Sequence, residues 1–258
     1  MTQSSALFEI RGLVKRFGDN VVLDGVDLDV RTGERITLIG ESGCGKSVLL
    51  KLMIGLMRPD AGRIVFDGED VTDLEERKWV RVRQRIGMLF QGDALFDSLC
   101  VADNVAYALR EQRLMDEAAI EERVRESLTQ VSLPGIEAMW PADLSGGMRK
   151  RVGLARAIAT RPTVVLYDEP TEGLDPVNVT RVDRLLDSLR AAHSTTTVIA
   201  TQNMRSAFST SDRLAFMHGG VVARVGTPDD IRQWGDPRVE PFCRAAELRA
   251  KTRPSLPA

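Results

Sequence analysis

Residues Gly40 to Ser47 read G-E-S-G-C-G-K-S and match the pattern G-x-x-x-x-G-K-S of a phosphate-binding loop. An apolar run at 36–39 precedes the loop and an apolar-periodic run at 48–57 follows it, which predicts a buried strand and then a helix. The glycines permit backbone conformations in which successive N–H groups surround an anion, and the helix points its positive end at the same place. An ordinary glycine-rich turn is the alternative, but the Lys-Ser pair and the flanking pattern argue against it.

Each residue type in this loop has an expected part in holding a nucleotide. Lys46 is expected to reach the β- and γ-phosphates, and the Ser47 hydroxyl is expected to bind Mg²⁺. The predicted nucleotide-binding residues are Gly40, Glu41, Ser42, Gly43, Cys44, Gly45, Lys46, Ser47 and Val48.

Composition narrows the remaining possibilities. The 258 residues suffice for one large domain or two small ones, and the net charge of −2 argues against binding nucleic acid through bulk charge. No run approaches the roughly 18 apolar residues of a membrane span, and no signal peptide is expected at the N-terminus. Cys44, Cys100 and Cys243 are widely spaced, which indicates reduced thiols, and His193 and His218 are too isolated to form a metal site.

The order of periodic segments predicts an α/β chain with two additions. Short β-like runs and turns between residues 6 and 39 predict an antiparallel flap before the phosphate loop. Helical periodicity from Val101 to about Val131 predicts an all-helical insert between two α/β halves. Further buried strands are expected at 86–90, 163–167 and 196–201, and a final helix at 237–250 followed by a frayed tail.

Phe17 precedes the predicted turn at Gly18. An aromatic ring there could stack on a purine, but its spacing is equally that of a core residue. The sequence pattern leaves both interpretations open.

Asp168 and Glu169 end the apolar strand at 163–167. Next to a phosphate loop, this arrangement predicts that Asp168 holds Mg²⁺, directly or through water, and that Glu169 polarises an attacking water. Two solvated carboxylates at a strand end are the alternative.

Ser145, Gly146 and Gly147 open a helix and form a second predicted anion-binding N-terminus. One triphosphate does not need two such sites in one chain. The two sites can serve different nucleotides if Ser145 of one copy faces the γ-phosphate held by Lys46 of another copy. A plain helix N-cap at Ser145 is the alternative.

Taken together, these motifs resemble the ATP-binding cassette (ABC) family in their order and spacing over about residues 7–235. The resemblance implies an α/β fold: a P-loop NTPase core with a mostly parallel sheet flanked by helices, an N-terminal antiparallel β subdomain and an α-helical subdomain. It also implies an ATPase that uses ATP and Mg²⁺ and works as a head-to-tail dimer with ATP sandwiched between the copies. Phe17 falls where the family stacks an aromatic on adenine, Gln91 on the loop that senses Mg²⁺ and water, and Asp175 on the loop that crosses the dimer interface. The implied domain spans 6–235, with the helical subdomain at about 92–160, and 236–258 forms a C-terminal helix and tail that can contact the dimer partner.

Gln202 departs from the family pattern. The family places a His after the strand that follows the catalytic Glu, and Gln202 occupies that position here. A Gln amide can donate a hydrogen bond, but it carries no charge and shuttles no proton. The resemblance implies catalytic roles for Glu169, Gln202 and Gln91, with a slower or less ATP-responsive enzyme as one consequence of Gln202.

Residues 88–111 point to a branch of the family. The stretch Gly92-Asp93-Ala94-Leu95-Phe96 after Gln91, followed by Asp103 to Glu111, resembles the ATPases of lipid-asymmetry (Mla) and Mce-associated phospholipid transporters, as does Met148 after Gly147. The resemblance implies a peripheral subunit on the cytoplasmic face of the inner membrane. Its partners would be a second copy, an integral membrane permease docked beside 94–109 and an Mce-type lipid-binding subunit, with no nucleic acid.

Two other interpretations remain open. A small-solute importer ATPase would share every catalytic residue named above. A non-transport ABC ATPase of DNA repair, chromosome organisation or translation would more often carry coiled-coil or zinc inserts or a second cassette.

Overall fold

The computed structural model describes residues 6–92, 94–113 and 115–248, and divides them into two compact units. The first unit contains residues up to Asp73 and those from Ile199 onward, and the second runs from Leu74 to Val198. Asp93, within the segment that suggested a lipid-transport branch, lies outside the described residues, as do 249–258 of the predicted final helix and tail.

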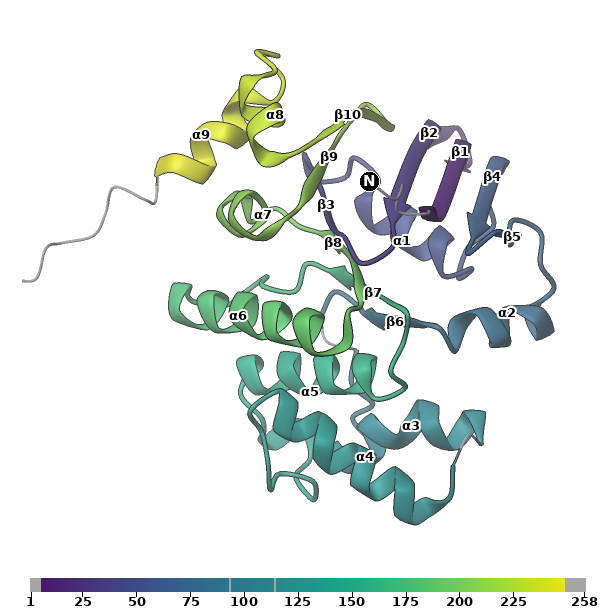
Figure 1. Cartoon of the computed structure of the whole chain (residues 1–258), viewed down its shortest axis with the longest axis vertical. Coiled ribbons are helices and arrows are strands. Elements are labelled where there is room, and N and C mark those ends of the chain that lie inside the picture. Colours follow the sequence, from purple (N-terminus) through teal and green to yellow (C-terminus); the bar gives the residue numbers. More distant parts are fainter. Residues whose placement is uncertain (1–5, 93, 114, 249–258) are drawn as a thin grey trace, which may run out of the picture. The chain divides into compact units, whose positions relative to one another are not determined.

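The first unit holds an antiparallel sheet and a separate group of strands around β3 (Figure 1). Its strands are β1 (Ala6–Phe17), β2 (Asn20–Arg31), β3 (Arg35–Gly40), β4 (Ala61–Phe66), β5 (Glu69–Asp70), β9 (Arg213–His218) and β10 (Val221–Gly226), and its helices are α1 (Lys46–Met53), α7 (Met204–Thr210), α8 (Pro228–Gln233) and α9 (Glu240–Leu248). The antiparallel sheet has the order β2-β1-β4-β5, while β3 pairs in parallel with β9, and β9 pairs with β10 in antiparallel fashion.

β1 and β2 are longer than the sequence pattern indicated. Each runs for 12 residues, where the sequence pattern predicted short β-like runs separated by turns. The pairing shifts register between Ile10 and Leu13, where Gly12 has a φ of 55°. A bulge of this kind adds a residue to one strand and resets which face each side chain occupies. The strand is therefore continuous although its hydrophobic alternation is not.

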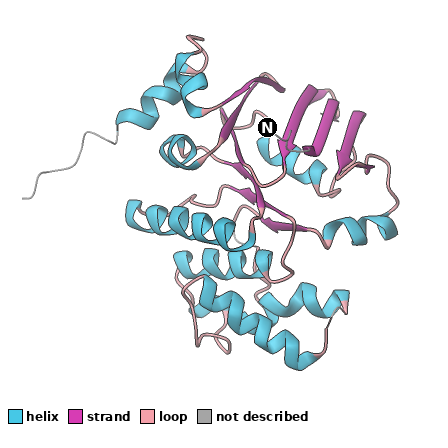
Figure 2. Cartoon of the chain, in the orientation of Figure 1, coloured by secondary structure: helices cyan, strands magenta, loops and turns pink. Residues whose placement is uncertain are grey.

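The second unit is rich in helices (Figure 2). It contains α2 (Glu76–Arg83), β6 (Ile86–Leu89), α3 (Val101–Gln112), α4 (Glu117–Gln130), a short 3₁₀ helix (Pro141–Asp143), α5 (Gly146–Ile158), β7 (Val164–Asp168) and α6 (Pro176–His193). β6 and β7 are fully buried and pair in parallel, from Ile86 opposite Val164 to Leu89 opposite Tyr167. α3, α4 and α5 pack on one another and form the predicted helical insert. β8 (Thr196–Ala200) lies where the chain passes from this unit to the first.

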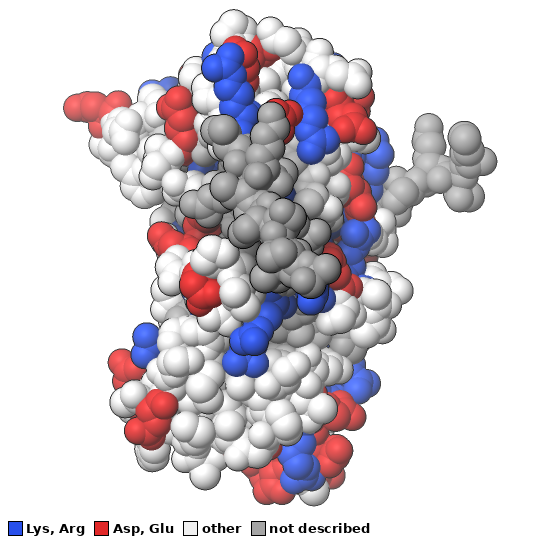
Figure 3. Space-filling view, turned by 90° about the vertical axis from the view of Figure 1, so that its left-hand side faces the viewer, with Lys and Arg blue, Asp and Glu red and all other residues white. Residues whose placement is uncertain are grey.

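These elements confirm the predicted α/β class, with parallel strand pairs, a preceding antiparallel sheet and a helical insert. The buried strands β3, β6 and β7 are the apolar runs that the sequence marked. Acidic and basic side chains are interspersed on the face seen in Figure 3, as the near-zero net charge leads one to expect.

Candidate nucleotide-binding site

The phosphate loop joins β3 to α1 in the first unit, and two of its glycines are required by their surroundings. Gly40 has a φ of 150°, and a Cβ placed on it would lie 2.2 Å from the carbonyl oxygen of Met217. Gly45 has a φ of 102°, and its Cβ would lie 2.5 Å from Cδ2 of Leu23. Only glycine adopts this left-handed backbone without strain and leaves this space. The loop is therefore held against β9 and β2 in one shape.

Lys46 lies folded into the loop rather than extended to solvent. Its side chain is 6% exposed, and Nζ donates hydrogen bonds to the carbonyl oxygens of Gly40, at 2.9 Å, and Glu41, at 2.8 Å. A buried ammonium is stable only with such partners. Its charge thus lies within the loop, where a phosphate chain would be bound.

The start of α1 suits an anion. Gly45 precedes the first helical residue, Lys46, and no side chain caps the helix, whose first turn contains no acidic residue. The N–H groups of the first turn have no partner within a helix, and they attract negative charge. Together with Lys46 and the glycine loop, these donors fit the phosphates of ATP, and the Ser47 hydroxyl at the second helical position fits the predicted Mg²⁺ ligand. The helix begins two residues before the predicted start at Val48 and ends at Met53 rather than Met57.

Phe17 ends β1 in the same unit, and its ring is 47% exposed. The core interpretation of this residue is therefore wrong. The ammonium of Lys15 lies 5.5 Å from the ring centroid, over one face, which is a cation–π arrangement. A half-exposed ring at this strand end has the form expected of a stacking platform.

Gln202 follows β8 and is exposed. The N–H of the preceding Thr201 donates to the carbonyl of Leu38 on β3, at 3.2 Å, and β3 leads into the phosphate loop at Gly40. Asn203 caps α7 by accepting a hydrogen bond from the N–H of Ser206. Gln202 is therefore fixed between a strand end and a helix cap, beside the strand that carries the phosphate loop.

In the second unit, Asp168 and Glu169 are buried, with 3% and 7% exposure. The alternative that they are solvated carboxylates is wrong. Glu169 has a φ of 49°, a left-handed conformation that costs a non-glycine residue about 1–2 kcal/mol. The strained backbone turns the chain sharply at the end of β7. Strain of this kind is common where a side chain must be aimed at a substrate.

Gln91 follows β6 after one residue, and its amide Nε2 donates to both carboxylate oxygens of Glu172, at 3.2 and 3.1 Å. Glu172 in turn lies three residues after Glu169, whose carbonyl accepts its N–H. Lys150 of α5, which is 7% exposed, also donates from Nζ to the Glu169 carbonyl, at 3.5 Å. The structure thus links Gln91 to the segment that carries Glu169.

Sequence reasoning missed Glu172 and Lys150. Glu172 lies in the turn after β7 and matches no pattern by itself. Lys150 interrupts an otherwise apolar face of α5, and a lysine at a predicted core position was the one available signal.

Ser145 is the N-cap of α5, since its Oγ accepts the N–H of Met148 at 3.3 Å. The N-cap interpretation is confirmed, but it does not explain the two glycines that follow. A Cβ on Gly146 would meet nothing nearer than 4.0 Å, and one on Gly147 nothing nearer than 3.8 Å. Alanine would therefore fit both positions, and it has the higher helix propensity. The chain's own packing does not require these glycines.

Asp175 is the N-cap of α6. Its carboxylate accepts the N–H groups of Asn178, at 3.1 Å, and Val177, at 3.0 Å, as well as the Asn178 side-chain amide. The backbone and side chain of Asn178 lower the pKa of the Asp175 carboxyl, so the group is ionised at neutral pH. A Cβ on Gly147 would meet the Asn178 side chain at 3.8 Å, which places the start of α6 beside the start of α5.

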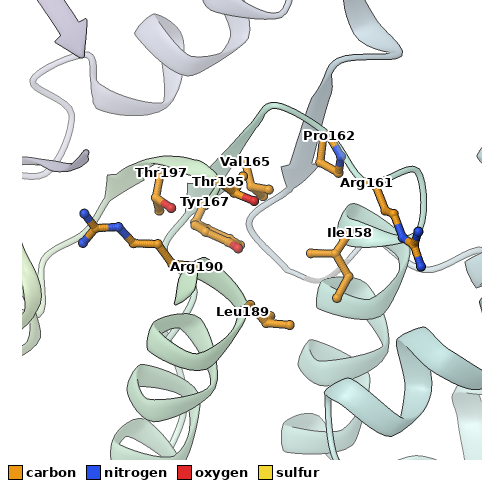
Figure 4. A pocket seen from close by; sticks show the side chains of 9 residues that line it. All are labelled: Ile158, Arg161, Pro162, Val165, Tyr167, Leu189, Arg190, Thr195 and Thr197. Carbon is orange, nitrogen blue, oxygen red and sulfur yellow. The ribbon is translucent and has the colours of Figure 1, made fainter. Parts of the chain in front are cut away.

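None of these residues lines a cavity of about 190 Å³ in the second unit (Figure 4). It is lined by side chains of β7, β8 and the ends of α5 and α6, including Tyr167, Thr195 and Thr197. The guanidinium groups of Arg161 and Arg190 point away from its centre, and Arg161 pairs with Glu126 at 3.0 Å. The cavity presents no charged group to a ligand.

Comparison with known proteins identifies the family to which a chain with these motifs belongs. The family model of the ABC transporter matches residues 23–172, more than half of the chain. The chain belongs to the ABC transporter family. It is therefore an ABC ATPase that binds and hydrolyses ATP, with Mg²⁺ as the metal expected for this family.

The relatives of this ABC ATPase differ in their named cargo. It is 38% identical to the probable ribonucleotide transport ATP-binding protein mkl of Mycobacterium leprae, over 93% of this chain and 69% of that protein. It is 37% identical to the intermembrane phospholipid transport system ATP-binding protein MlaF of Haemophilus influenzae, over 92% of this chain and 90% of MlaF. It is 41% identical to the sulfate/thiosulfate import ATP-binding protein CysA 2 of Chromobacterium violaceum, over 86% of this chain and 59% of that protein.

Among solved structures, this ABC ATPase is similar to the dimeric ATP-binding cassette MJ0796 in a post-hydrolysis state with ADP and Pi. The TM-score is 0.80 at 28% identity, and the match covers 86% of this chain and 98% of that one. None of the helices in the described part of the chain combines the length and the apolar character needed to cross a membrane.

Proposed function

We propose that this ABC ATPase powers the movement of phospholipid or a related apolar lipid through a membrane permease, as one of two identical copies on the cytoplasmic face of the inner membrane. The observation that carries the dimer is the pair of glycines at 146 and 147, which the chain's own packing leaves unexplained. Close approach of a phosphate held by another copy explains them, because a side chain at either position would keep that phosphate away.

In this proposal each site takes residues from two copies. Phe17 stacks on the base, residues 40–48 hold the phosphates, and Ser47, Asp168 and Gln91 surround Mg²⁺. Ser145, Gly146, Gly147 and Asp175 of the second copy close the site. The metal neutralises charge on the β- and γ-phosphate oxygens when it is bound.

Glu169 is the general base of the proposed reaction. It takes a proton from the attacking water, whose oxygen bonds to the γ-phosphorus as the bond to the bridging oxygen breaks, giving ADP and phosphate. Burial and the fixed backbone turn hold its carboxylate in one orientation. Gln202 donates a hydrogen bond to the γ-phosphate from its amide.

The surface proposed for the permease lies on α3 and on the segment between β6 and α3. Phe96 and Tyr107 are 41% and 42% exposed, and their ring centroids lie 4.7 Å apart. The guanidinium of Arg156 lies 5.8 Å from the Phe96 ring, and its Nη1 donates to the carbonyl of Ala94 at 2.7 Å. An exposed aromatic pair held in this way offers a rigid apolar contact to a helix of a membrane protein.

Two features support a lipid as the cargo. Residues 88–111 resemble the lipid-transport branch, and MlaF, a phospholipid transport ATPase by name, is 37% identical over nearly its whole length. We extend the proposal to an Mce-type lipid-binding subunit in the same complex. The domain that performs ATP hydrolysis is proposed to span 6–235, with its helical subdomain at about 92–160, and 236–258 to contact the second copy.

The test is to purify the tagged chain from membranes with its partner and to identify bound lipids by mass spectrometry. The Glu169→Gln variant, which should hold ATP without hydrolysing it, is compared with Lys46→Ala, which should not hold ATP. We expect an integral permease and phospholipid in a fixed ratio to the complex. Recovery of a permease with a soluble solute-binding protein and no lipid would overturn the lipid cargo, and recovery of nucleic acid or ribosomes would overturn transport.

A further inference from the structure

An open cleft of about 460 Å³ lies in the second unit, between the end of α4, the middle of α5 and α6. Three arginines line it: Arg151 from α5, and Arg181 and Arg184 from α6. Gln130, Ser132 and Ser188 add an amide and two hydroxyl groups, and no acidic residue lines the cleft. The lining is therefore rich in hydrogen-bond donors and positive charge. Its volume falls in the range of about 300–1,000 Å³ that small-molecule sites occupy.

Arg151 is held in place by the backbone. Nη1 donates to the carbonyl oxygens of Ser132, at 3.1 Å, and Val131, at 3.4 Å, and Nε donates to that of Gly147, at 3.3 Å. These bonds use only part of the guanidinium, since within the described residues Nη2 of Arg151 has no hydrogen-bond partner. With Nε and Nη1 bonded to the backbone, the Nη2 amino group supplies the donors that remain for an oxyanion.

The positive charge of the cleft is not balanced by acidic side chains. None of the three arginines forms an ion pair with the described part of the chain, and Arg181 contacts only the Asn178 side chain, at 3.5 Å. Burial lowers the pKa of the Arg151 guanidinium, and the nearby charge of Arg181 lowers it further. Elsewhere the protein pairs its arginines closely, as Arg110 does with Asp103 and Glu117. The repulsion between Arg151 and Arg181 is a cost that a bound anion would remove.

We propose that this cleft binds a small oxyanion with two or more negative charges, of the phosphate or polycarboxylate class. Guanidinium groups donate to such oxygens, and the Ser132 hydroxyl can donate a further hydrogen bond, whereas the Ser188 hydroxyl already donates to the Leu185 carbonyl at 2.8 Å. The site shares no residue with the phosphate loop, since every residue that lines it belongs to the second unit. It contacts the segment Ser145–Gly147 directly, because Nε of Arg151 donates a hydrogen bond to the carbonyl of Gly147.

The test is a calorimetric titration of the full chain with inorganic pyrophosphate, at saturating ADP so that the nucleotide site is filled. The double variant Arg181→Gln/Arg184→Gln removes two charges from the cleft. Arg77→Gln/Arg125→Gln is the matched control, because it removes two charges from exposed arginines of the same unit that already pair with Glu75 and Glu122. We expect one saturable site per chain, weakened about tenfold or more in the cleft variant and unchanged in the control.

A second series compares citrate and a hexaglutamate peptide as probes. Citrate that competes with pyrophosphate assigns the cleft to small oxyanions in general, and citrate that does not compete restricts it to the phosphate class. Tighter binding of the peptide than of either small ion would overturn the proposal in favour of an acidic protein segment. Absence of saturable binding, or equal affinity in both double variants, would also overturn it. ATP binding is measured in the same variants. Normal ATP binding without anion binding would overturn the cleft proposal alone, whereas loss of ATP binding would indicate failure of the nucleotide site.

Discussion

In the proposed site, Gln202 is the residue that donates a hydrogen bond to the γ-phosphate, so a charged or proton-carrying side chain at this position should affect hydrolysis. The strand end and the cap of α7 fix its backbone, so a different side chain at this point should be presented in the same way. Neutral hydrogen bonds contribute about 0.5–1.5 kcal/mol and those to charged groups about 1.5–3 kcal/mol. The choice of Gln therefore bears on rate rather than on folding.

We predict that Gln202→His keeps or raises ATPase activity, by up to about tenfold, because an imidazolium would stabilise the charge that develops on the phosphate. Since a histidine has a pKa of about 6.5, the ratio of variant to wild-type activity should fall as the pH rises from about 6 to about 8. Steady-state phosphate release over that pH range measures it. A pH-independent gain would assign the effect to shape rather than charge.

The substitution Glu169→Gln should have the opposite effect on ATPase activity to Gln202→His. The amide can occupy the same space but cannot accept the proton from water, so turnover should fall at least about a hundredfold while ATP binding is retained. Nucleotide binding by fluorescence and phosphate release, measured side by side, separate the two effects. Unchanged turnover would remove Glu169 from the role of base.

The role of a residue could be predicted from the sequence where a local motif defines it, but not where its three-dimensional surroundings decide. The phosphate loop was recognised because its glycines and Lys46 form a dense local pattern. Phe17 stayed ambiguous since only the three-dimensional position of a strand end decides whether a ring is covered. The reason for Gly146 and Gly147 could not be read at all, because it appears only when the space around each Cβ is known.

At the scale of elements, the loop before α3 depends on one buried side chain. Asn104 is fully buried, accepts the N–H of Phe96 at 2.8 Å, and donates to the carbonyl oxygens of Phe96, Leu99 and Cys100 at 2.9–3.1 Å. It therefore ties residues 96–100 to the first turn of α3. No helical periodicity could reveal this, because the sequence shows only a polar residue within an apolar-periodic helix.

We predict that Asn104→Ala destabilises the second unit by about 1–3 kcal/mol, because it leaves buried backbone groups unpaired. Phe96 and Tyr107 should lose their fixed positions, so recovery of the permease should fall while ATP binding is retained. Thr129→Ala is the control, since it removes an exposed hydrogen bond to the Arg125 carbonyl on α4. Thermal unfolding and copurification check both parts. If Asn104→Ala lowers stability as expected but the permease is still fully recovered, the docking surface does not include Phe96 and Tyr107.

Backbone features also explain why the observed boundaries of α1, β1 and β2 differ from the predicted ones. Helix α1 begins at Lys46 because Gly45, in a left-handed conformation, serves as its cap, whereas apolar periodicity begins only at Val48. The strands β1 and β2 appeared fragmented because bulges interrupt their alternation. In each case a backbone feature, invisible in side-chain patterns, set the boundary.

At the scale of the whole molecule, the proposed site is complete only when two copies meet. In dilute solution without permease, ATPase activity should therefore rise more steeply than in proportion to protein concentration, until the dimer predominates. Phosphate release over a dilution series measures this. A specific activity that stays constant down to the lowest concentrations would indicate that one copy suffices, or that the dimer does not dissociate.

Mixing two inactive variants separates those outcomes. Lys46→Ala disables the phosphate loop. Gly147→Asp places a carboxylate at a helix N-terminus, where the fold has room and the dipole favours it, but where it repels a phosphate. A mixed dimer pairs the intact phosphate loop of one copy with the intact residues 145–147 of the other. An equimolar mixture should therefore recover about a quarter of wild-type activity, because half of the dimers are mixed and each has one of two sites intact. Recovery can occur only if the closing residues come from the other copy. A mixture as inactive as its components, in which the copies are shown to exchange, would place both halves of the site in a single chain.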